Sequence, residues 1–265
     1  MQDSLEQYLE IGLKAVAQGG EVLRKHWGKL ERINHKKATI DLVTEADKDS
    51  ETAILKILRE TFPDHSILGE ETGLHGDQKN GYQWIVDPLD GTTNYTHQYP
   101  IVSISLALWH REQPLIGIVY NPIFEELFQA VQGKGAFLNG SSIHVSSIST
   151  LDKSLLATGF PYDRRENPDN NYKEFCQLSQ LCQGVRRGGS AALDLAYVAC
   201  GRLDAYWERG IKPWDVAAGI LLVKEAGGIV SNYEKAPYVF SKEKILASNG
   251  FLHDSISYSL IGLVG

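Results

Sequence analysis

The residues of this chain with the clearest chemical meaning are two aspartates, Asp87 and Asp90, in the stretch WIVDPLDGTTNY over residues 84–95. The stretch reads as an apolar strand that runs into a turn, and Pro88 biases Asp87 toward an extended conformation. Both carboxylates can then converge on one side of the turn, where two of them about 4 Å apart repel by about 4 kcal/mol at an effective dielectric of 20. A hard divalent cation removes that repulsion, and all-oxygen ligands favour Mg²⁺ over zinc. Taken alone, the spacing is more typical of a solvated turn in which Asp90 caps a helix.

Two further acidic stretches change that interpretation. GEETG at residues 69–73 puts Glu70 just after an expected strand, and KPWDVAAG at residues 212–219 puts Asp215 at the start of an apolar helix. Singly, Glu70 would be a surface turn residue and Asp215 an N-cap. Together, the signatures WIVDPLDGTTNY and WDVAAG resemble the inositol monophosphatase family of Mg²⁺-dependent, lithium-sensitive phosphatases, over essentially the whole chain. The order and spacing of four acidic residues match as well: Asp47, Glu70, Asp87 and Asp215.

That resemblance implies a metal centre made of four acidic side chains and one backbone carbonyl. Glu70, Asp87 and the carbonyl of Leu89 would bind a first Mg²⁺. A second would be bound by Asp87, Asp90 and Asp215, and Glu70 would help to hold a third, weaker ion. Four carboxylates and a dianionic phosphate sum to about −6, so two Mg²⁺ leave about −2 and three leave about zero. Binding of a phosphate dianion in this acidic cleft therefore requires the metals.

The resemblance also assigns the residues that act on water and on the phosphate. Thr92, paired with Asp47, would orient and activate the attacking water, and Glu70 would join them as a catalytic residue. Backbone N–H groups at Gly91 and Thr92 would hold the phosphate at a helix start, where the helix dipole favours an anion. Lys36 falls at the spacing of a loop lysine that family members place near the metals, a position that is also typical of a solvated loop charge.

Substrate specificity is expected in residues 186–208. Four residues there occupy positions that contact inositol hydroxyls in the family: Gly189, Ser190, Ala191 and Glu208. The substrate is also expected to contact Asp90, Gly91, Thr92 and Asp215. An anionic Glu208 suits a polyol and would repel a second phosphate, although its position is also typical of a strand-end surface charge. Arg186 and Arg187 are open to a structural role or to facing a second acidic group.

The implied function is that of a phosphoric monoester hydrolase, with inositol 1-phosphate as the leading substrate. One metal would lower the pKa of a bound water that attacks phosphorus in line, and a second would stabilise the leaving alkoxide. The alternatives within the class are fructose-1,6-bisphosphate and other sugar, nucleotide or histidinol phosphates. The sequence SAA from Ser190 makes histidinol phosphatases a poorer match, because they commonly carry an aspartate and aromatic pattern there. A different class is a regulatory protein that keeps the fold without catalysis, but every expected ligand is present here.

Composition and charge limit where this protein works and what it binds. Its 265 residues carry a formal net charge of −7, which argues against nucleic acid as the main partner, because phosphate backbones are bound largely by Lys and Arg. The longest apolar runs, 101–109 and 216–223, fall short of the roughly 18–20 residues that span a bilayer, and the amino terminus does not resemble a secretory signal. Three cysteines without CxxC spacing fit buried thiols in a reducing cytosol, so we expect a cytoplasmic protein. The family resemblance implies a homodimer.

Two helices, a β-rich middle and an alternating carboxyl-terminal part are expected to position these residues. Apolar residues at helical spacing predict helices near 4–27 and 53–62, and Thr44 followed by Asp47 resembles a capping box for the second. One larger sheet is predicted from short β-rich segments, with hairpin turns at 133–135 and 139–140, at residues 66–68, 84–86, 101–109, 115–120 and 127–131. A second, more parallel sheet is predicted from strands near 155–158, 204–207, 229 and 245, which alternate with helices at 172–182, 191–200 and 216–226.

We therefore expect an α/β fold of the α+β type. The resemblance specifies it as the layered α-β-α-β-α sandwich of the inositol monophosphatase, fructose-1,6-bisphosphatase and sugar phosphatase superfamily. No low-complexity linker separates the two halves of the chain. Residues 1–150 would form an N-terminal α+β subdomain with most metal ligands, and residues 151–265 a C-terminal α/β subdomain with Asp215 and the specificity residues.

Overall fold

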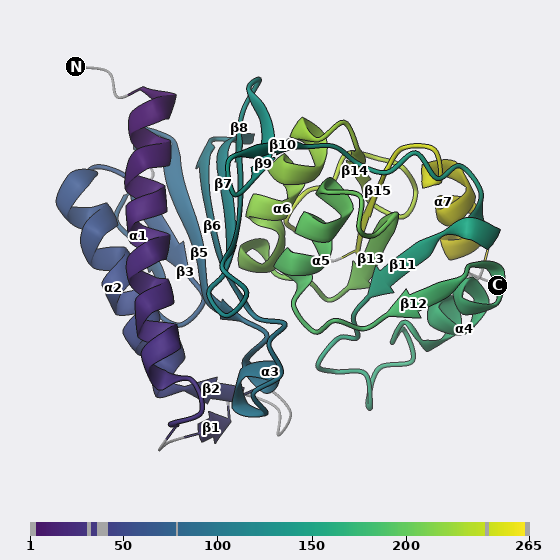
Figure 1. Cartoon of the computed structure of the whole chain (residues 1–265), viewed down its shortest axis with the longest axis horizontal. Coiled ribbons are helices and arrows are strands. Elements are labelled where there is room, and N and C mark those ends of the chain that lie inside the picture. Colours follow the sequence, from purple (N-terminus) through teal and green to yellow (C-terminus); the bar gives the residue numbers. More distant parts are fainter. Residues whose placement is uncertain (1–3, 31–32, 36–41, 78, 242–243, 263–265) are drawn as a thin grey trace.

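Layers of helix and sheet alternate across the molecule in Figure 1, which shows the computed structural model of the chain. The structure describes residues 4–30, 33–35, 42–77, 79–241 and 244–262. Its helices are α1 (Leu5–His26), α2 (Glu45–Thr61), α3 (Thr92–Thr96), α4 (Tyr172–Leu181), α5 (Ala191–Ala199), α6 (Pro213–Glu225) and α7 (His253–Ile261), with a 3-10 turn at Leu151–Lys153. Its strands are β1 (Ile33–His35), β2 (Leu42–Thr44), β3 (Ser66–Gly69), β4 (Gly73–His75), β5 (Tyr82–Asp90), β6 (Ser103–His110), β7 (Gln113–Asn121), β8 (Glu126–Val131), β9 (Gly135–Leu138), β10 (Ser141–Ile143), β11 (Leu155–Thr158), β12 (Gly184–Arg186), β13 (Ala205–Arg209), β14 (Ile229–Ser231) and β15 (Lys244–Ser248).

The larger sheet has eight strands within the described residues, in the order β10-β9-β8-β7-β6-β5-β3-β4. Its neighbouring strands pair antiparallel, except that β3 runs parallel to β5. Strand β6 is buried on both faces because helices cover both. Leu106 and Leu108 belong to the apolar cluster formed with α1 and α2, whereas Ala107 belongs to the cluster formed with α5 and α6. The near-continuous apolar run in β6 follows from this burial on two sides.

The smaller sheet has five strands in the order β12-β11-β13-β15-β14. Strand β11 pairs parallel with β12 and β13, and β15 pairs antiparallel with β13 and β14. Parallel pairs require a crossover connection. Helix α4 connects β11 to β12, and α5 connects β12 to β13. No described helix lies between β14 and β15, so β15 runs back antiparallel. The sheet is therefore mixed, and it is more parallel than the larger sheet, as the sequence pattern predicted.

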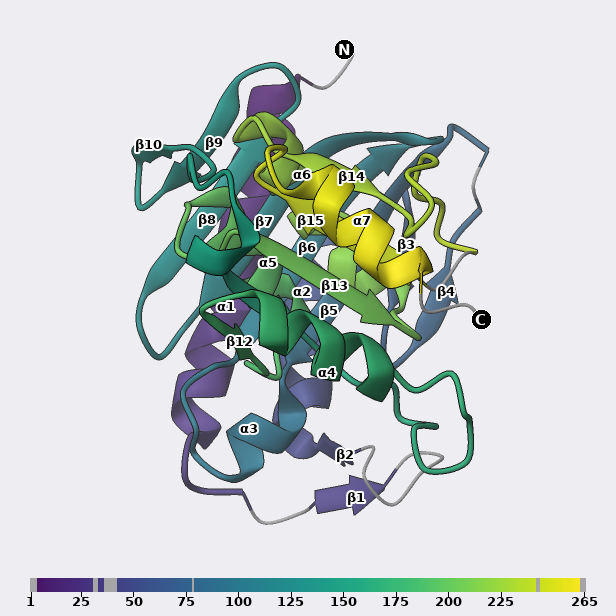
Figure 2. The same cartoon turned by 90° about the vertical axis from the view of Figure 1, so that its right-hand side faces the viewer.

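Three apolar clusters hold the layers together and confirm the α-β-α-β-α arrangement. One joins α1 and α2 to the larger sheet, and a second packs α5 and α6 between the two sheets. The third packs α4 and α7 on the outer face of the smaller sheet, which Figure 2 shows from that side. The larger sheet uses residues 66–143 and the smaller one residues 155–248, while the division into subdomains near residue 150 stays a prediction.

Several local expectations can be compared directly with the structure. The capping box of α2 is confirmed, with Thr44 and Asp47 bonded to each other. Helix α7 was not predicted from the sequence. The expectation of buried thiols is wrong for Cys176, which is exposed because α4 lies on the outer face and turns little more than Leu178 inward. Cys182, after α4, and Cys200, after α5, are half-buried. None of the described helices combines the length and apolar character that crossing a bilayer requires.

Candidate active site

Three carboxylates, from Asp87, Asp90 and Asp215, converge with an oxygen of each within 4.8 Å of the others. Asp87 and Asp90 end β5, and Asp215 lies in the first turn of α6. A regular strand would point residues three positions apart to opposite faces. The pairing with β6 instead contains a bulge, because Asp87 pairs with Ser105 and Asp90 with Ser103, so three steps on β5 oppose two on β6. The bulge accounts for both carboxylates reaching the same side.

Asp215 is oriented by the helix that it helps to begin. The Lys212 backbone N–H donates to Asp215 Oδ2 at 2.8 Å, which caps the first turn of α6. The hydroxyl of Ser105 donates to the Trp214 carbonyl at 2.9 Å and so ties this turn to β6. One Asp215 oxygen therefore caps the helix. Because α6 packs against the larger sheet, its first turn places the carboxylate in the cluster.

Asp90 is held by the second half of the chain. Its Oδ2 accepts hydrogen bonds from the Ser190 hydroxyl at 2.7 Å and from the Ala192 backbone N–H at 2.8 Å, both at the start of α5. Ser190 and Ser103 share a further hydrogen bond of 3.0 Å between their hydroxyls. The supporting roles of Ser103 and Ser190 escaped sequence reasoning, because serines in a strand and at a helix start are common and only the fold brings them beside Asp90.

The cluster carries more negative charge than its own surroundings neutralise. Burial, followed by the charges of Glu70, Asp90 and Asp215, raises the pKa of Asp87 well above its usual range. Burial also raises the pKa of Asp90 to about 6, although hydrogen bonds from Ser190 and Ala192 and the charge of Arg187 lower it. The pKa of Asp215 is raised well above its usual range by burial and then by Asp90 and Glu70. Such a set of oxygen donors favours a hard divalent cation.

Glu70 lies in the same cavity but outside the group of three carboxylates. It follows β3, and its backbone N–H donates to the Val86 carbonyl at 3.1 Å, which places Glu70 beside the end of β5. The buried Glu51 of α2 accepts a hydrogen bond from the Glu71 N–H at 3.2 Å and supports this turn from below. The predicted neighbourhood of Glu70 and Asp87 is thus present, and Glu51 is an addition that no sequence signal indicated.

Thr92 and Asp47 form the pair that the sequence predicted. The Thr92 hydroxyl is 3.0 Å from Asp47 Oδ1 and 3.2 Å from the Leu89 carbonyl. Asp47 is completely buried, and its other oxygen accepts bonds from the backbone and hydroxyl of Thr44. Burial raises the pKa of Asp47 to about 7, against those hydrogen bonds. Thr92 lines the cavity, whereas Asp47 is not among the described residues that line it.

A cavity of about 430 Å³ extends from the carboxylates toward β13 and the loop after β11. Glu208 lies at that far end, where Tyr206 donates its hydroxyl to Glu208 Oε2. Burial raises the pKa of Glu208 to about 7, while the bond from Tyr206 and the charge of Arg187 lower it. The buried Asp194 also lines this end, and sequence reasoning missed it. Asp194 faces the cavity because of where α5 begins, and the local sequence does not show that starting point.

Most of the predicted site residues line this one cavity. They are Glu70, Asp87, Leu89, Asp90, Gly91, Thr92, Gly189, Ser190, Ala191, Glu208 and Asp215. Arg187 lines it as well, whereas Arg186 is an exposed residue whose guanidinium donates to the Val185 carbonyl at 3.5 Å. Lys36 lies outside the described residues. The roles of these residues stay predictions, but eleven of the predicted site residues converge on one cavity.

Comparisons with known proteins agree with this geometry. A model of the inositol monophosphatase family matches residues 4–261. An inositol-1-monophosphatase from Synechocystis sp. is 53% identical over 256 residues, 97% of this chain and 89% of that protein. A Nus factor SuhB from Pseudomonas aeruginosa is 41% identical over 250 residues, 92% of each chain. The solved structure of an inositol monophosphatase from Anabaena (Nostoc) sp. has a TM-score of 0.90 at 51% identity and covers 97% of this chain and 96% of that one.

Proposed function

Because this chain belongs to the inositol monophosphatase family, we propose that it is a phosphoric monoester hydrolase that converts inositol 1-phosphate to inositol and phosphate. The observation that carries the proposal is the convergence of Asp87, Asp90 and Asp215 at one end of a cavity whose other end holds Glu208. A metal-dependent phosphate site and an acceptor for hydroxyl groups then lie within reach of one small molecule.

The donor set fits Mg²⁺, and we propose two or three ions per active site. Glu70, Asp87 and the Leu89 carbonyl would hold the first, Asp87 with Asp90 and Asp215 the second, and Glu70 would help with a weaker third. The three clustered carboxylates offer only oxygen atoms, and they repel one another until a cation is bound. When bound there, Mg²⁺ supplies Lewis-acid chemistry that activates water and stabilises charge on the leaving oxygen.

Thr92 and Asp47 are proposed to orient the attacking water. The Thr92 hydroxyl proton points to Asp47 Oδ1, 3.0 Å away, so the lone pairs of Thr92 Oγ1 remain to accept a hydrogen bond from water in the cavity. Asp47 in its ionised form accepts that hydrogen bond and so fixes the rotamer of Thr92. Glu70 lies on the same side of the cavity and would accept a second bond from the water.

The phosphate and the polyol are proposed to occupy opposite ends of the cavity. Backbone N–H groups of Gly91 and Thr92 would bind the phosphate, and Gly91 adopts φ +94°, where a Cβ would lie 2.9 Å from the Ile101 carbonyl. Gly189, Ser190, Ala191 and Glu208 would contact the hydroxyls. An ionised Glu208 accepts hydrogen bonds from hydroxyl groups and repels a second phosphate, which favours a monophosphate over fructose 1,6-bisphosphate.

Phosphate release from four esters tests this assignment. Inositol 1-phosphate, fructose 1,6-bisphosphate, histidinol phosphate and 3′-phosphoadenosine 5′-phosphate would each be incubated with Mg²⁺ and with a chelator. We expect turnover of inositol 1-phosphate that requires Mg²⁺, and preferential turnover of another ester would reassign the substrate. Release from none of them would favour the alternative of a regulatory protein. The similarity to a protein named Nus factor SuhB makes that alternative relevant.

Further properties are proposed from the family and from composition. We infer inhibition by lithium and a homodimeric state from the family. The net charge of −7, the short apolar runs and the cysteine pattern support a cytoplasmic location and a small phosphorylated polyol, rather than nucleic acid or a membrane, as partner. Lithium titration of phosphate release and sedimentation of the purified protein test the first two. A lithium-resistant enzyme or a monomer at micromolar concentration would contradict them.

A further inference from the structure

The loop between β11 and α4, residues 159–171, forms the wall of the cavity beside Glu208. Its first residues, 159–162, line the cavity. Its two ends are joined, because the side-chain amide of Asn171 donates to the Gly159 carbonyl at 2.6 Å and to the Thr158 hydroxyl at 2.7 Å. A compact surface loop with closed ends is an Ω-loop, and such loops frequently carry function. Here the closed loop brings backbone and aromatic groups to the substrate cavity.

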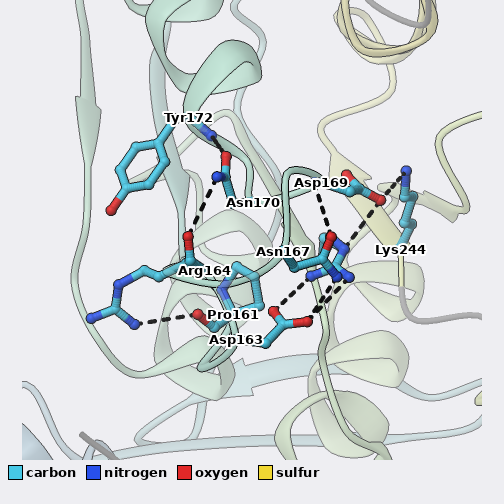
Figure 3. A network of polar contacts seen from close by, with 9 residues as sticks. Pro161, Asp163, Arg164, Asn167, Asp169, Asn170, Tyr172 and Lys244 are labelled. Atoms are coloured by element: carbon cyan, nitrogen blue, oxygen red, sulfur yellow. Dashed lines mark hydrogen bonds and ion pairs between the residues drawn. The ribbon is translucent and has the colours of Figure 1, made fainter.

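Arg209 holds the body of this loop through Asp163 and Asp169, two residues of the polar network drawn in Figure 3. Its guanidinium bonds Asp163 through two nitrogens, at 2.9 and 3.4 Å, and contacts Asp169 at 3.1 Å. Lys244 on the neighbouring strand also reaches Asp169, at 3.1 Å, and Asn167 donates to Asp163 at 2.9 Å. Two cations therefore face two carboxylates, which balances the charge across the contact between loop and sheet.

The geometry of this ion pair makes it stronger than an ordinary surface contact. The Arg209 side chain is only 13% exposed, and a fork-to-carboxylate pairing fixes direction as well as distance. The hydrogen bond from Arg209 holds the pKa of Asp163 below its usual range. The planar arrangement cannot be reproduced by lysine, which offers a single charged nitrogen.

Strand β13 uses its two faces for different purposes. Successive side chains of a strand point to opposite sides, so Tyr206 and Glu208 share the face toward the cavity. Trp207 and Arg209 share the other face, where the Trp207 indole donates to Asn171 at 2.7 Å and Arg209 binds the loop body. One short strand thus carries the substrate-facing carboxylate and both anchors of the loop.

The loop in turn sets the space available to Glu208. A Cβ built on Gly159 would lie 2.1 Å from Glu208 Oε2, so the loop backbone packs directly against this carboxylate. Displacement of the loop would loosen that contact with Glu208 and change the shape of the cavity end. The phosphate end, built on Asp87, Asp90 and Asp215, has no contact with Arg209 among those that the structure describes.

We propose that Arg209 is a positioning residue for the polyol end of the cavity, because its pairing with Asp163 and Asp169 fixes the 159–162 wall against Glu208. This inference rests on the proposed function. It follows that Arg209 governs the binding of the hydroxylated part of the substrate and leaves phosphate chemistry unaffected. The preference for a polyol phosphate over a phosphate ester without hydroxyls therefore depends on a residue that does not touch the substrate.

The test compares inositol 1-phosphate with phenyl phosphate, whose leaving group offers no additional hydroxyls. In Arg209→Met, which keeps much of the aliphatic packing, we expect KM for inositol 1-phosphate to rise about tenfold. The kcat for that substrate and both constants for phenyl phosphate should stay within about twofold. Arg209→Lys should recover part of the loss, and Asp163→Asn should change KM in the same direction as Arg209→Met.

Arg202→Met is the matched control. Arg202 also pairs with a carboxylate, Glu126, at 2.6 Å, but it does not line the cavity. Hydrogen exchange over residues 159–171 adds a readout that needs no substrate, and it should be faster in Arg209→Met and unchanged in Arg202→Met.

Equal losses on both substrates, or an unchanged KM for inositol 1-phosphate, would overturn the positioning role. If the wild type does not turn over inositol 1-phosphate, the proposed function fails. The exchange measurement then tests by itself whether Arg209 holds the 159–171 loop. Unchanged exchange in Arg209→Met would overturn it.

Discussion

Removal of divalent ions should destabilise this protein, and the loss should increase with pH. In the metal-free protein the pKa of Asp90 is raised from 3.8 to about 6, chiefly by burial, so the folded state binds a proton more tightly than the unfolded state does. The stability that this proton provides is fully present below about pH 4 and is lost as the pH rises through about 6. Asp87 and Asp215 shift in the same direction, and they add to the effect.

The size of the effect follows from the same shift. A rise in pKa from 3.8 to about 6 corresponds to roughly 3 kcal/mol that opposes folding with Asp90 ionised. Mg²⁺ at a hundred times its dissociation constant stabilises the folded state by about 2.7 kcal/mol, which is of similar size. For a protein of this length, about 3 kcal/mol corresponds to a change in Tm of roughly 6–12 °C.

Thermal unfolding with MgCl₂ at about a hundred times its measured dissociation constant, or with a chelator, at pH 5 and at pH 8 and constant ionic strength, measures this directly. We expect the Mg²⁺-induced rise in Tm to be several degrees larger at pH 8. In Asp90→Asn, whose amide oxygen can still accept the bond from Ser190, the metal-free protein should be more stable at pH 8 and the Mg²⁺ effect smaller. Asp152→Asn, at an exposed residue of the 3-10 turn, is the control. A Mg²⁺ effect that is absent, or equal at both pH values, would refute the reasoning.

Three substitutions test other parts of the site. Thr92→Ala should lower kcat by about a hundredfold or more, since proton handling of this kind contributes about 10²–10⁴, whereas Thr92→Ser should keep most of the activity; equal losses would disprove the hydroxyl's role. Ser190→Ala should raise the Mg²⁺ concentration for half-maximal activity about tenfold by freeing Asp90, and a change in KM alone would contradict this. Gly91→Ala, at φ +94°, should destabilise the fold by about 1–3 kcal/mol in urea unfolding, and an unchanged midpoint would show that the backbone adapts.

The sequence was sufficient to predict the cluster of three carboxylates because its residues lie in local signatures. Asp87 and Asp90 share one turn and Asp215 begins a helix, and the two signatures that contain them together resemble a known family, which indicated the chemistry that spacing alone did not. The bulge that turns Asp87 and Asp90 to one side could not be predicted, since it depends on the register between β5 and β6. Register depends on the apolar pattern of both strands and on the connection between them, so one strand alone does not show where it shifts.

The supporting residues were harder to predict for a related reason. Arg209 and Asp163 are 46 positions apart, and each alone is an ordinary surface residue by type. Helix α7 was missed because its polar residues, such as Ser255 and Ser257, dilute the apolar period that Ile256 and Leu260 provide. Long-range contacts and weakly amphipathic segments are decided by tertiary packing, which the local pattern does not encode.

The bond between Asp90 and the start of α5 has a consequence for the growing chain on the ribosome. The half that carries Asp87 and Asp90 is synthesised first, and domains generally begin to fold from the N-terminal end during synthesis. At that stage Asp90 has neither Ser190 nor Ala192 to orient it, and Asp215 has not yet been translated. A nascent chain with only that half therefore lacks one of the three clustered carboxylates and the groups that orient another. On the proposed function, such a chain would be inactive until α5 and α6 have been made and folded.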